Sequence, residues 1–386
     1  MKISIIGAGI TGLSTAILLK IKGFDVCVYE RNSKISDIGA GIVCWPNACF
    51  VLEKMGVLSE LKKIAYKPKY MKRLSKEGEL LGIIPILKLN ELMNYPSYSI
   101  LRKDLMKVLL IQAEKLKINI LYNYNLTKLA SSSKKSTSLY FENGSCFKSD
   151  IVLGADGRMN STVRTYVCGQ NSPVYQGFIN WIGTFESKEK IFSKNEISDY
   201  WGIGERFGIV PVSETKAYWA GAIYQKKIAD NNENLYKFEL NKIFRFWPNP
   251  IGKIIKDTPL KSIKKIYIHD HDPIQTWHKN NVLLIGDASH AALPTSGQGA
   301  CQALEDAWHL SQCLKIDSVD IKIVFQNFTL KRLKKTSIIN KIGRNIAADL
   351  FNDSKVFCKN RNTEAQGINY EALAYSMART WRSDLY

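Results

Sequence analysis

Three glycines near the start of the chain have the spacing of a phosphate-binding turn. Gly7, Gly9 and Gly12 form the pattern G-x-G-x-x-G between a short apolar run, residues 3–6, and a stretch with helical apolar spacing, residues 13–21. In such a turn the first glycine allows a sharp bend, the second admits a pyrophosphate, and the third lets the helix pack on the strand. The start of the helix then directs free N–H groups at the phosphates. The pattern predicts a dinucleotide site.

An acidic residue at the end of the next predicted strand supports this interpretation. Residues 26–29 are β-prone and end at Glu30, about 20 residues beyond the glycines, where such a residue binds the ribose hydroxyls of a dinucleotide. We expect Glu30 and the adjacent Arg31 to belong to the cofactor site.

Two later segments place aspartates at the ends of buried strands. Asp156 and Gly157 follow the apolar run 151–153, and Asp287 follows the apolar run 282–285. Ligands of open α/β sheets lie at the carboxyl ends of the strands. A further turn precedes a predicted helix and contains Pro294, Gly297, Gln298, Gly299 and Ala300. The first glycine motif does not separate FAD from NAD, but these additional turns indicate FAD.

Taken together, the motifs resemble those of the single-component flavin-dependent aromatic hydroxylases, whose fold is that of para-hydroxybenzoate hydroxylase. The resemblance covers residues 1 to about 315. It implies bound FAD, transient binding of NADPH or NADH, and hydroxylation of an aromatic or heteroaromatic small molecule by O2 through a flavin C4a-hydroperoxide. It also implies that Asp287 binds the ribityl chain, that the turn at Asp156 and Gly157 serves FAD and the nicotinamide, and that Arg102 contacts FAD.

Within this family, the aromatic segment around Trp181 and the run 297–306 resemble the salicylate, hydroxybenzoate and urate hydroxylase branch. That likeness implies that Arg206 and Tyr218 contact the substrate, and both are therefore candidate catalytic residues. An arginine beside a flavin would hold an anionic or carbonyl-rich ring by a forked hydrogen bond, and a phenol would orient the ring or relay a proton. The alternatives are an ordinary surface ion pair for Arg206 and core packing for Tyr218.

Other residues near the motifs favour structural interpretations. We expect His290 to support the flavin loop more than to act as a general base. Trp45 and Trp181 pack in the core or line the substrate pocket, and Glu305 with Asp306 forms a helix cap or a salt-bridge pair.

The elements that position these residues predict a mixed α/β (α+β) fold. Residues 66–99 are broken by prolines and glycines, which is typical of antiparallel strands and loops. We expect a Rossmann-like FAD-binding domain in three segments, interleaved with an antiparallel-sheet substrate domain in two and followed by C-terminal helices. The segments are residues 1–70, 99–172 and 270–320 for the first, 71–98 and 173–269 for the second, and 321–386 for the third.

Composition limits the class of protein. A chain of 386 residues with 45% hydrophobic and 23% charged residues is typical of a globular protein of two or three domains, and no run suits a membrane span. Eight cysteines occur without a C-x-x-C pair. This pattern argues against a structural metal site and a disulfide framework and favours a cytoplasmic location.

The net charge of +19 raises the question of a polyanionic partner. Nucleic-acid readers cluster arginine, whereas here lysines are spread along the chain, so we expect a solvated surface, the basic run 331–335 included, and no nucleic-acid partner. We expect a monomer or homodimer. The alternatives are an FAD-dependent epoxidase or reductase of another substrate class, and a non-enzymatic FAD- or polyanion-binding protein.

Overall fold

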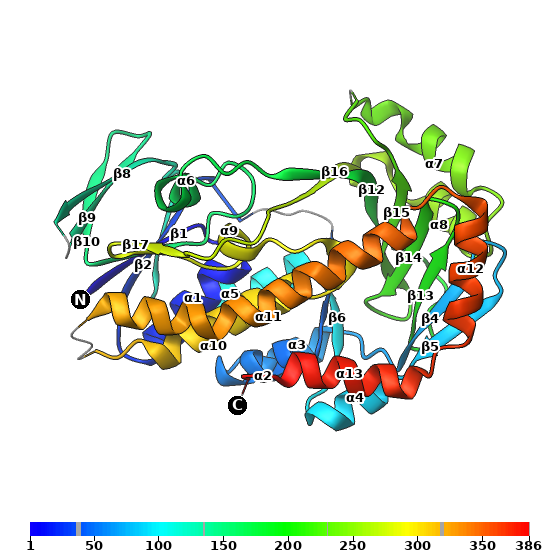
Figure 1. Ribbon diagram of the computed structural model, residues 1–386, viewed down its shortest axis with the longest axis horizontal. Helices are drawn as coiled ribbons and strands as arrows, with labels where there is room; N and C mark the ends of the chain where they lie inside the picture. The colour runs from blue at the N-terminus through cyan, green and yellow to red at the C-terminus, as the bar shows by residue number, and fades with distance from the viewer. Residues whose placement is uncertain (36–39, 134–135, 230, 317–319, 386) are drawn as a thin grey trace.

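The first glycine turn follows a central strand of a six-stranded sheet (Figure 1). The computed structural model describes residues 1–35, 40–133, 136–229, 231–316 and 320–385. The sheet order is β17-β18-β11-β1-β2-β7, and all neighbours are parallel except β17 with β18. The strands are β1 (Lys2–Ile6), β2 (Asp25–Glu30), β7 (Asn119–Tyr122), β11 (Ile151–Gly154), β17 (His278–Lys279) and β18 (Val282–Leu284).

Both faces of this sheet are buried, as is usual for parallel strands. One face packs Ile3, Ile5 and Val28 against helices, and the other packs Ile6 and Val152 against a three-stranded sheet of order β10-β9-β8. The helices are α1 (Ile10–Ile21), α5 (Arg102–Lys115) and α10 (Gly299–Cys313), and the strands are β8 (Leu126–Ser133), β9 (Ser136–Phe141) and β10 (Cys146–Ser149). Two short helices, α6 (Thr162–Cys168) and α9 (Asp287–His290), follow β11 and β18.

A seven-stranded sheet forms the second layer system, at the right of Figure 1. Its order is β16-β12-β15-β14-β13-β4-β5, with only the β13–β4 pair parallel. The outer face packs Trp181, Phe207 and Trp219 against α7 (Tyr236–Phe244) and α8 (Ile251–Asp257). Because side chains alternate along a strand, the neighbouring residues point to the inner face. The strands are β4 (Tyr70–Ser75), β5 (Leu80–Ile84), β12 (Val174–Glu186), β13 (Glu196–Trp201), β14 (Glu205–Pro211), β15 (Lys216–Tyr224) and β16 (Lys264–Asp270).

A strand pair brings the two sheets into contact. β3 (Gly41–Cys44) pairs antiparallel with β6 (Tyr98–Leu101). A Cβ added at Gly41 would lie 2.6 Å from the Cβ of Tyr218, so the glycine allows β3 to lie directly against the inner face of the seven-stranded sheet. The helices of this region are α2 (Pro46–Lys54), α3 (Leu58–Ile64) and α4 (Ile86–Met93). Among the described residues, the 3-10 helices are η1 (Glu233–Leu235), η2 (Leu260–Ser262) and η3 (Pro294–Ser296).

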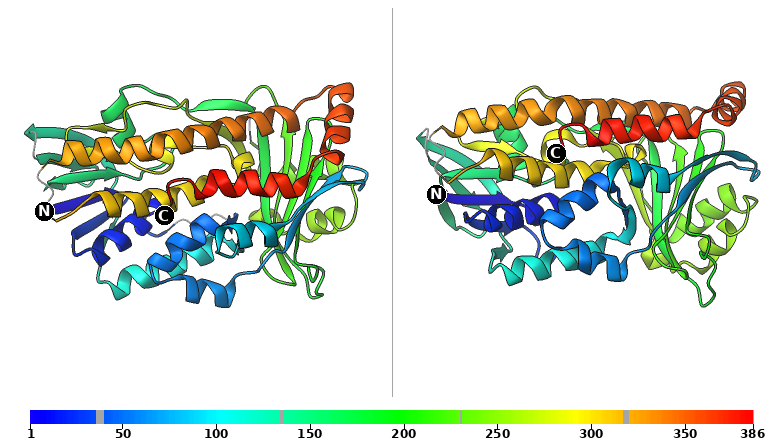
Figure 2. Two further views of the ribbon diagram at one scale, coloured as in Figure 1. Left: turned by 60° about the horizontal axis from the view of Figure 1, so that its bottom comes forward. Right: turned by 90° about the horizontal axis from the view of Figure 1, so that it is seen from below.

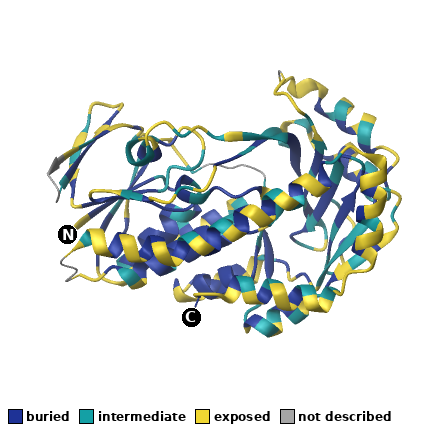
Figure 3. Cartoon of the chain, viewed as in Figure 1, coloured by how far each residue is buried: buried dark blue, intermediate teal, exposed yellow. Residues whose placement is uncertain are grey.

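The C-terminal part consists of a long helix and two shorter ones. α11 (Ile321–Leu350) runs from the six-stranded sheet to the seven-stranded sheet (Figure 1), and α12 (Lys355–Gln366) packs on β5. α13 (Tyr370–Arg382) returns alongside α4 (Figure 2). One side of α11 is buried and the other is exposed (Figure 3).

The structure confirms the predicted mixed α/β fold with two sheets and C-terminal helices. The division into domains by residue range stays a prediction. No helix in the described part of the chain is both long and apolar enough to cross a membrane. Helix α4 shows that the expectation of strands and loops alone between residues 66 and 99 was wrong. Pro85 comes just before the first turn of this helix, where a proline is tolerated, and does not interrupt it.

Candidate active site

The three glycines of the first turn have different surroundings. A Cβ added at Gly7 would lie 2.4 Å from the carbonyl oxygen of Ala155, and one added at Gly12 would lie 1.9 Å from that of Gly7. These two glycines are therefore required by the packing of the chain itself. A Cβ at Gly9 would meet nothing within 4 Å. The space over Gly9 fits a pyrophosphate, as expected of the second glycine in this motif.

A cavity of about 200 Å³ opens at this turn and is lined by the residues that follow β1, by the end of β2 at Glu30 and by the turn after β11 at Asp156. Glu30 closes one side, and its carboxylate accepts hydrogen bonds from the backbone N–H of Ala8 at 2.9 Å and from the backbone and side chain of Asn32 at 2.9 and 2.7 Å. These bonds hold the carboxylate at the carboxyl end of β2. The predicted cofactor residues that line the cavity are Gly7, Gly9, Glu30, Arg31, Arg102, Asp156 and Gly157.

Arg102 presents a buried donor to this cavity. It is the first residue of α5, and its Nε atom has no hydrogen-bond partner in the described residues. Burial lowers the pKa of Arg102, and the nearby Arg158 adds to this effect while Asp287 opposes it. A buried guanidinium with an unused donor is costly unless an anion is bound. The arrangement fits the phosphates of FAD.

Asp156 shapes the second turn. Its carboxylate accepts hydrogen bonds from the Ser161 hydroxyl at 2.5 Å and from the backbone N–H of Val163 at 3.1 Å, so it anchors the start of α6. Gly157 has φ +81, and a Cβ there would meet nothing within 4 Å. From α6, Arg164 donates to the carbonyl oxygen of Ala288 at 2.7 Å. The turn at Asp156 and Gly157 therefore supports the turn at Asp287.

Asp287 is the first residue of α9, directly beyond β18. Its side chain is 40% exposed, and its nearest cation is Arg158, at 3.6 Å. Gly286 precedes it with φ +60, and a Cβ there would lie 2.3 Å from the hydroxyl of Thr11 in α1. The glycine thus lets the turn at Asp287 pack on the first helix. This brings Asp287 and the first glycine turn to the same edge of the sheet.

The last predicted turn forms as expected. Pro294, Gly297, Gln298, Gly299 and Ala300 make up the 3-10 turn η3 and the first turn of α10. A Cβ at Gly299 would meet nothing within 4 Å, which leaves the helix start open to a ligand. The Gln298 side chain points inward, and its Oε1 accepts a hydrogen bond from Asn47 Nδ2 at 2.8 Å.

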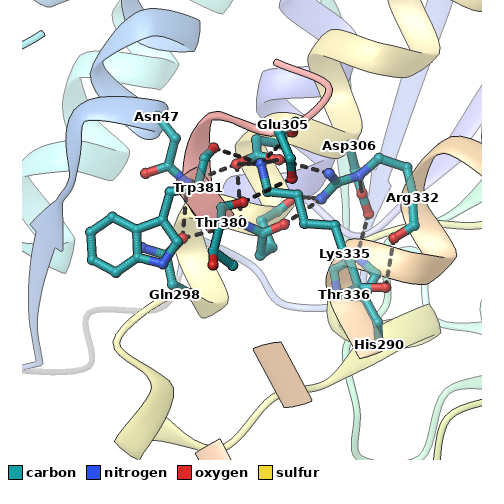
Figure 4. A network of polar contacts seen from close by, with 12 residues as sticks. Asn47, His290, Gln298, Glu305, Asp306, Arg332, Lys335, Thr336, Thr380 and Trp381 are labelled. Carbon is teal, nitrogen blue, oxygen red and sulfur yellow. Dashed lines mark hydrogen bonds and ion pairs between the residues drawn. The ribbon is translucent and has the colours of Figure 1, made fainter. Parts of the chain in front are cut away.

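Behind this turn, α10 carries two adjacent carboxylates that are fully buried, Glu305 and Asp306 (Figure 4). Arg332 donates from Nε to Asp306 at 2.6 Å and from Nη1 to Glu305 at 2.7 Å. Asp306 Oδ2 also accepts from the backbone N–H of Gly286 at 2.7 Å and lies 2.6 Å from His290 Nε2. Burial acts to raise the pKa of Asp306, but His290 and Arg332 outweigh it and hold that pKa well below its usual range. The salt-bridge interpretation of the two carboxylates is confirmed.

The basic run of α11 is therefore not a solvated face, and that prediction was wrong. Arg332 and Lys335 are buried, at 0% and 3% exposed, whereas Lys331 and Lys334 are exposed. Residues three apart share one side of a helix, so the periodicity turns two of the four cations toward the carboxylates of α10. The charge run alone does not show this.

Lys335 connects the carboxylates to the end of α13. Its ammonium lies 2.9 Å from a carboxylate oxygen of α10 and donates to the carbonyl oxygen of Trp381 at 2.6 Å. The Trp381 ring lies 5.2 Å from that of Trp45, and Trp45 Nε1 donates to the carbonyl oxygen of Gly297 at 3.0 Å. Trp45 thus packs and positions the last turn. Trp181 packs in the core on the outer face of the seven-stranded sheet.

The two candidate catalytic residues lie apart from the cavity, on the inner face of the seven-stranded sheet. Arg206 is in β14 and Tyr218 in β15, and Tyr218 stands opposite Val210. Burial raises the pKa of Tyr218 to about 12, and Arg206 opposes this shift. Arg206 donates from Nε to Asp199 at 2.6 Å and is 23% exposed, so it is half-buried and ion-paired. Neither its Nη atoms nor the Tyr218 hydroxyl bonds to a described residue.

Sequence reasoning missed Asp199, and it placed Arg332 and Lys335 on the surface. The signal for Asp199 was available, since an aspartate inside an aromatic β-prone segment needs a cation or a donor nearby. No local signal marks Arg332 and Lys335, because their partners lie in a different helix.

Comparison with known proteins agrees with this geometry. Residues 1–316 match the FAD binding domain family. The chain is 31% identical over 324 residues to the aurachin C monooxygenase/isomerase of Stigmatella aurantiaca, covering 82% of each chain. It is 30% identical over 316 residues to the FAD-dependent urate hydroxylase of Klebsiella pneumoniae, covering 80% of this chain and 79% of that one.

A solved structure extends the likeness to the whole chain. Klebsiella pneumoniae HpxO complexed with FAD and uric acid superposes with a TM-score of 0.90 at 25% identity, covering 99% of this chain and 97% of that one. The family match spans more than half of the sequence, and both relatives are named for oxygenation reactions. The chain belongs to the FAD binding domain family and is an FAD-dependent monooxygenase.

Proposed function

We propose that the protein uses NAD(P)H and O2 to hydroxylate an aromatic or heteroaromatic ring that binds on the inner face of the seven-stranded sheet, next to β3. The observation that carries this is the pair Arg206 and Tyr218. Both project from that face, and both keep donors that no described residue uses. The names of the relatives, urate hydroxylase and 6-hydroxynicotinate 3-monooxygenase among them, support a ring with oxygen substituents.

Residues at the six-stranded sheet would hold the cofactor, and residues at the seven-stranded sheet would hold the substrate. FAD, when bound, accepts hydride from NAD(P)H and activates O2 for transfer of one oxygen atom to the substrate. Gly9 and Gly299, each with open space where a Cβ would lie, would hold it together with Arg102, whose Nε has no described partner, and Asp287, whose side chain is 40% exposed. Arg206 would donate to a carbonyl or anionic oxygen of the ring. With its pKa raised to about 12, Tyr218 stays protonated at neutral pH and acts as a donor.

Substrate-stimulated oxidation of NADH and NADPH tests the activity. Urate, salicylate, hydroxybenzoates, 6-hydroxynicotinate and polycyclic antibiotics would be screened with the holoenzyme. We expect at least one to raise the rate and to yield a product carrying one atom from ¹⁸O2. Stimulation without oxygen incorporation would contradict the proposal.

The Arg206→Gln variant tests the substrate contact. We expect it to keep FAD and the basal oxidase rate but to lose about 30- to 1,000-fold in kcat/KM for the best substrate, with more NAD(P)H ending as hydrogen peroxide. Arg206→Lys should restore little of this kcat/KM, because an ammonium group cannot form the two parallel hydrogen bonds of a guanidinium. Arg245→Gln is the control, since Arg245 is exposed beyond α7 on the outer side of the same sheet. A wild-type coupling ratio in Arg206→Gln would remove Arg206 from the substrate site.

A further inference from the structure

Asp199 is a buried carboxylate whose partners lie on its own hairpin. It is 6% exposed in β13, on the inner face of the seven-stranded sheet. Its Oδ1 accepts a hydrogen bond from Arg206 Nε at 2.6 Å, and its Oδ2 accepts one from Trp201 Nε1 at 2.9 Å. A carboxylate so far from water is stable only when it is paired and hydrogen-bonded. The orientation of Asp199 is therefore fixed by two directional bonds.

The register of the hairpin explains how the pair forms. In the β13–β14 ladder, Trp201 stands opposite Arg206 and Asp199 stands opposite Gly208. Asp199 and Arg206 are thus diagonal neighbours on one face, a separation that an arginine side chain spans. Because Gly208 has no side chain, the space opposite Asp199 is open, and a Cβ added at Gly208 would lie 3.7 Å from Arg206 Nη2. The guanidinium lies over this glycine.

The aromatic neighbour of the pair is itself fixed. Arg73 and Arg361 lie over the Trp201 ring, at 5.0 and 5.4 Å from its centre. Arg361 also donates to the carbonyl oxygen of Gly202 at 2.9 Å. Two cations thereby hold Trp201 in place, and its Nε1 hydrogen bond passes this constraint to Asp199.

This geometry leaves one edge of the Arg206 guanidinium available. Asp199 occupies Nε, whereas the two Nη atoms bond to none of the described residues. The charge of Arg206 opposes the rise that burial causes in the pKa of Tyr218. A guanidinium held at Nε cannot rotate freely, so its Nη1–Nη2 edge points in one direction as a planar fork.

We propose that Asp199 is a positioning residue that sets the direction of the Arg206 fork and so selects a ring bearing a carbonyl or anionic oxygen at one position. This inference rests on the proposed substrate contact of Arg206. Gly208 contributes to this positioning, because its lack of a side chain leaves the space in which the guanidinium lies.

The Asp199→Asn variant tests the inference. Asparagine keeps the size and one acceptor but removes the charge that holds Nε. We expect KM for the best substrate to rise about 10- to 100-fold, as for loss of a hydrogen bond to a charged group, and the peroxide fraction to rise with it. FAD affinity should stay near wild type, because Asp199 does not line the cavity at the glycine turn. A merely structural role would lower the melting temperature and leave KM and the peroxide fraction unchanged.

Two further variants control for folding and charge. Glu196→Gln removes a different carboxylate of β13, which pairs with Lys72 at 2.7 Å, and it should leave KM unchanged. Gly208→Val leaves Asp199 intact but fills the space under the guanidinium, and its backbone conformation accepts a β-branched residue. We expect Gly208→Val to raise KM and the peroxide fraction as Asp199→Asn does.

The outcomes separate this inference from the proposed function. If Arg206→Gln matches wild type, the substrate contact itself is wrong. If Arg206→Gln is impaired while Asp199→Asn and Gly208→Val keep wild-type KM and coupling, only the positioning role is wrong. In the double variant of Asp199→Asn and Arg206→Gln, the second substitution should add no further loss. Additive losses would show that Asp199 acts elsewhere and would overturn the inference.

Discussion

Two arginines of this protein make the same contact through Nε and differ in burial and in the partners of their other donors. Arg332 and Arg206 each donate from Nε to an aspartate at 2.6 Å. Arg332 is 0% exposed, and its remaining donors bond to Glu305 at 2.7 Å and to the side-chain oxygen of Gln302 at 2.7 Å. Arg206 is half-buried, and its Nη atoms bond to no described residue. All three guanidinium nitrogens of Arg332 bond within the fold, whereas the Nη atoms of Arg206 are available to a ligand.

The difference assigns separate roles to the two regions. The buried carboxylates around Arg332 hold the turns that we propose to contact FAD, so substitutions there should act first on stability and cofactor affinity. The hairpin around Arg206 holds no cofactor turn, so substitutions there should act first on substrate coupling.

The largest effect is expected for Arg332→Met. Removing this cation leaves Glu305 and Asp306 without the one residue that bonds to both, and breaking a buried pair in this way costs about 3–5 kcal/mol of unfolding free energy. Urea denaturation of the holoenzyme at saturating FAD measures the loss. Lys331→Met, exposed on the same helix, is the control. Equal stability of the two variants would mean that the buried network is not structural.

An effect of similar size is expected from acid. Burial lowers the pKa of His309 to about 4, and its Nε2 has no partner in the described residues. Because this pKa is below that of the unfolded chain, the stability linked to neutral His309 is complete above pH 6.5 and is lost as pH falls toward 4, by about 3 kcal/mol in total.

The His309→Gln variant isolates this contribution. Between pH 7 and pH 4 its unfolding free energy should fall by less than that of wild type, and the difference between the two curves gives the histidine term. Parallel curves would show that His309 titrates normally in the folded protein. Arg206→Gln should leave the shape of the curve unchanged, since Arg206 lies in the seven-stranded sheet and His309 lies in α10.

The smallest effect is expected for Asp287→Ala. Loss of a hydrogen bond to the ribityl chain should cost about 1–3 kcal/mol, or about 5- to 150-fold in FAD affinity. Fluorescence titration of apoprotein with FAD measures this change, with Arg206→Gln expected to bind FAD as wild type does. If Asp287→Ala and wild type titrate identically, Asp287 lies outside the cofactor site.

The turns of the proposed cofactor site could be predicted from sequence because part of what they require is local. Gly12 is required by the carbonyl oxygen of Gly7 in the same turn, and such a requirement leaves a fixed spacing in the chain. The strands that carry Asp156 and Asp287 are buried on both faces and therefore appear as uninterrupted apolar runs.

The buried network that supports the proposed cofactor turns could not be predicted, because its partners are distant in sequence. Whether Lys335 faces water or a carboxylate depends on how α11 lies on α10, and a basic run has the same appearance in both cases. Helix α4 was missed because Pro85 has the appearance of a breaker, although Ile86 and Leu89 are fully buried beyond it. The sequence signal of Asp199 is an aspartate inside an aromatic β-prone segment, but its pairing with Arg206 also depends on the register of β13 and β14.

The hydrogen bonds of Lys335 to the carbonyl oxygens of Trp381 and Ser383 form only after α13 has been synthesised. Every turn proposed to hold FAD leaves the exit tunnel before α13 does. During that interval the Lys335 ammonium lacks two acceptors, and Trp45 lacks its aromatic neighbour. A premature stop codon within α13, ahead of Trp381, would delete none of the residues proposed to bind FAD, yet the truncated chain would lack these contacts beside the turn at Gly297.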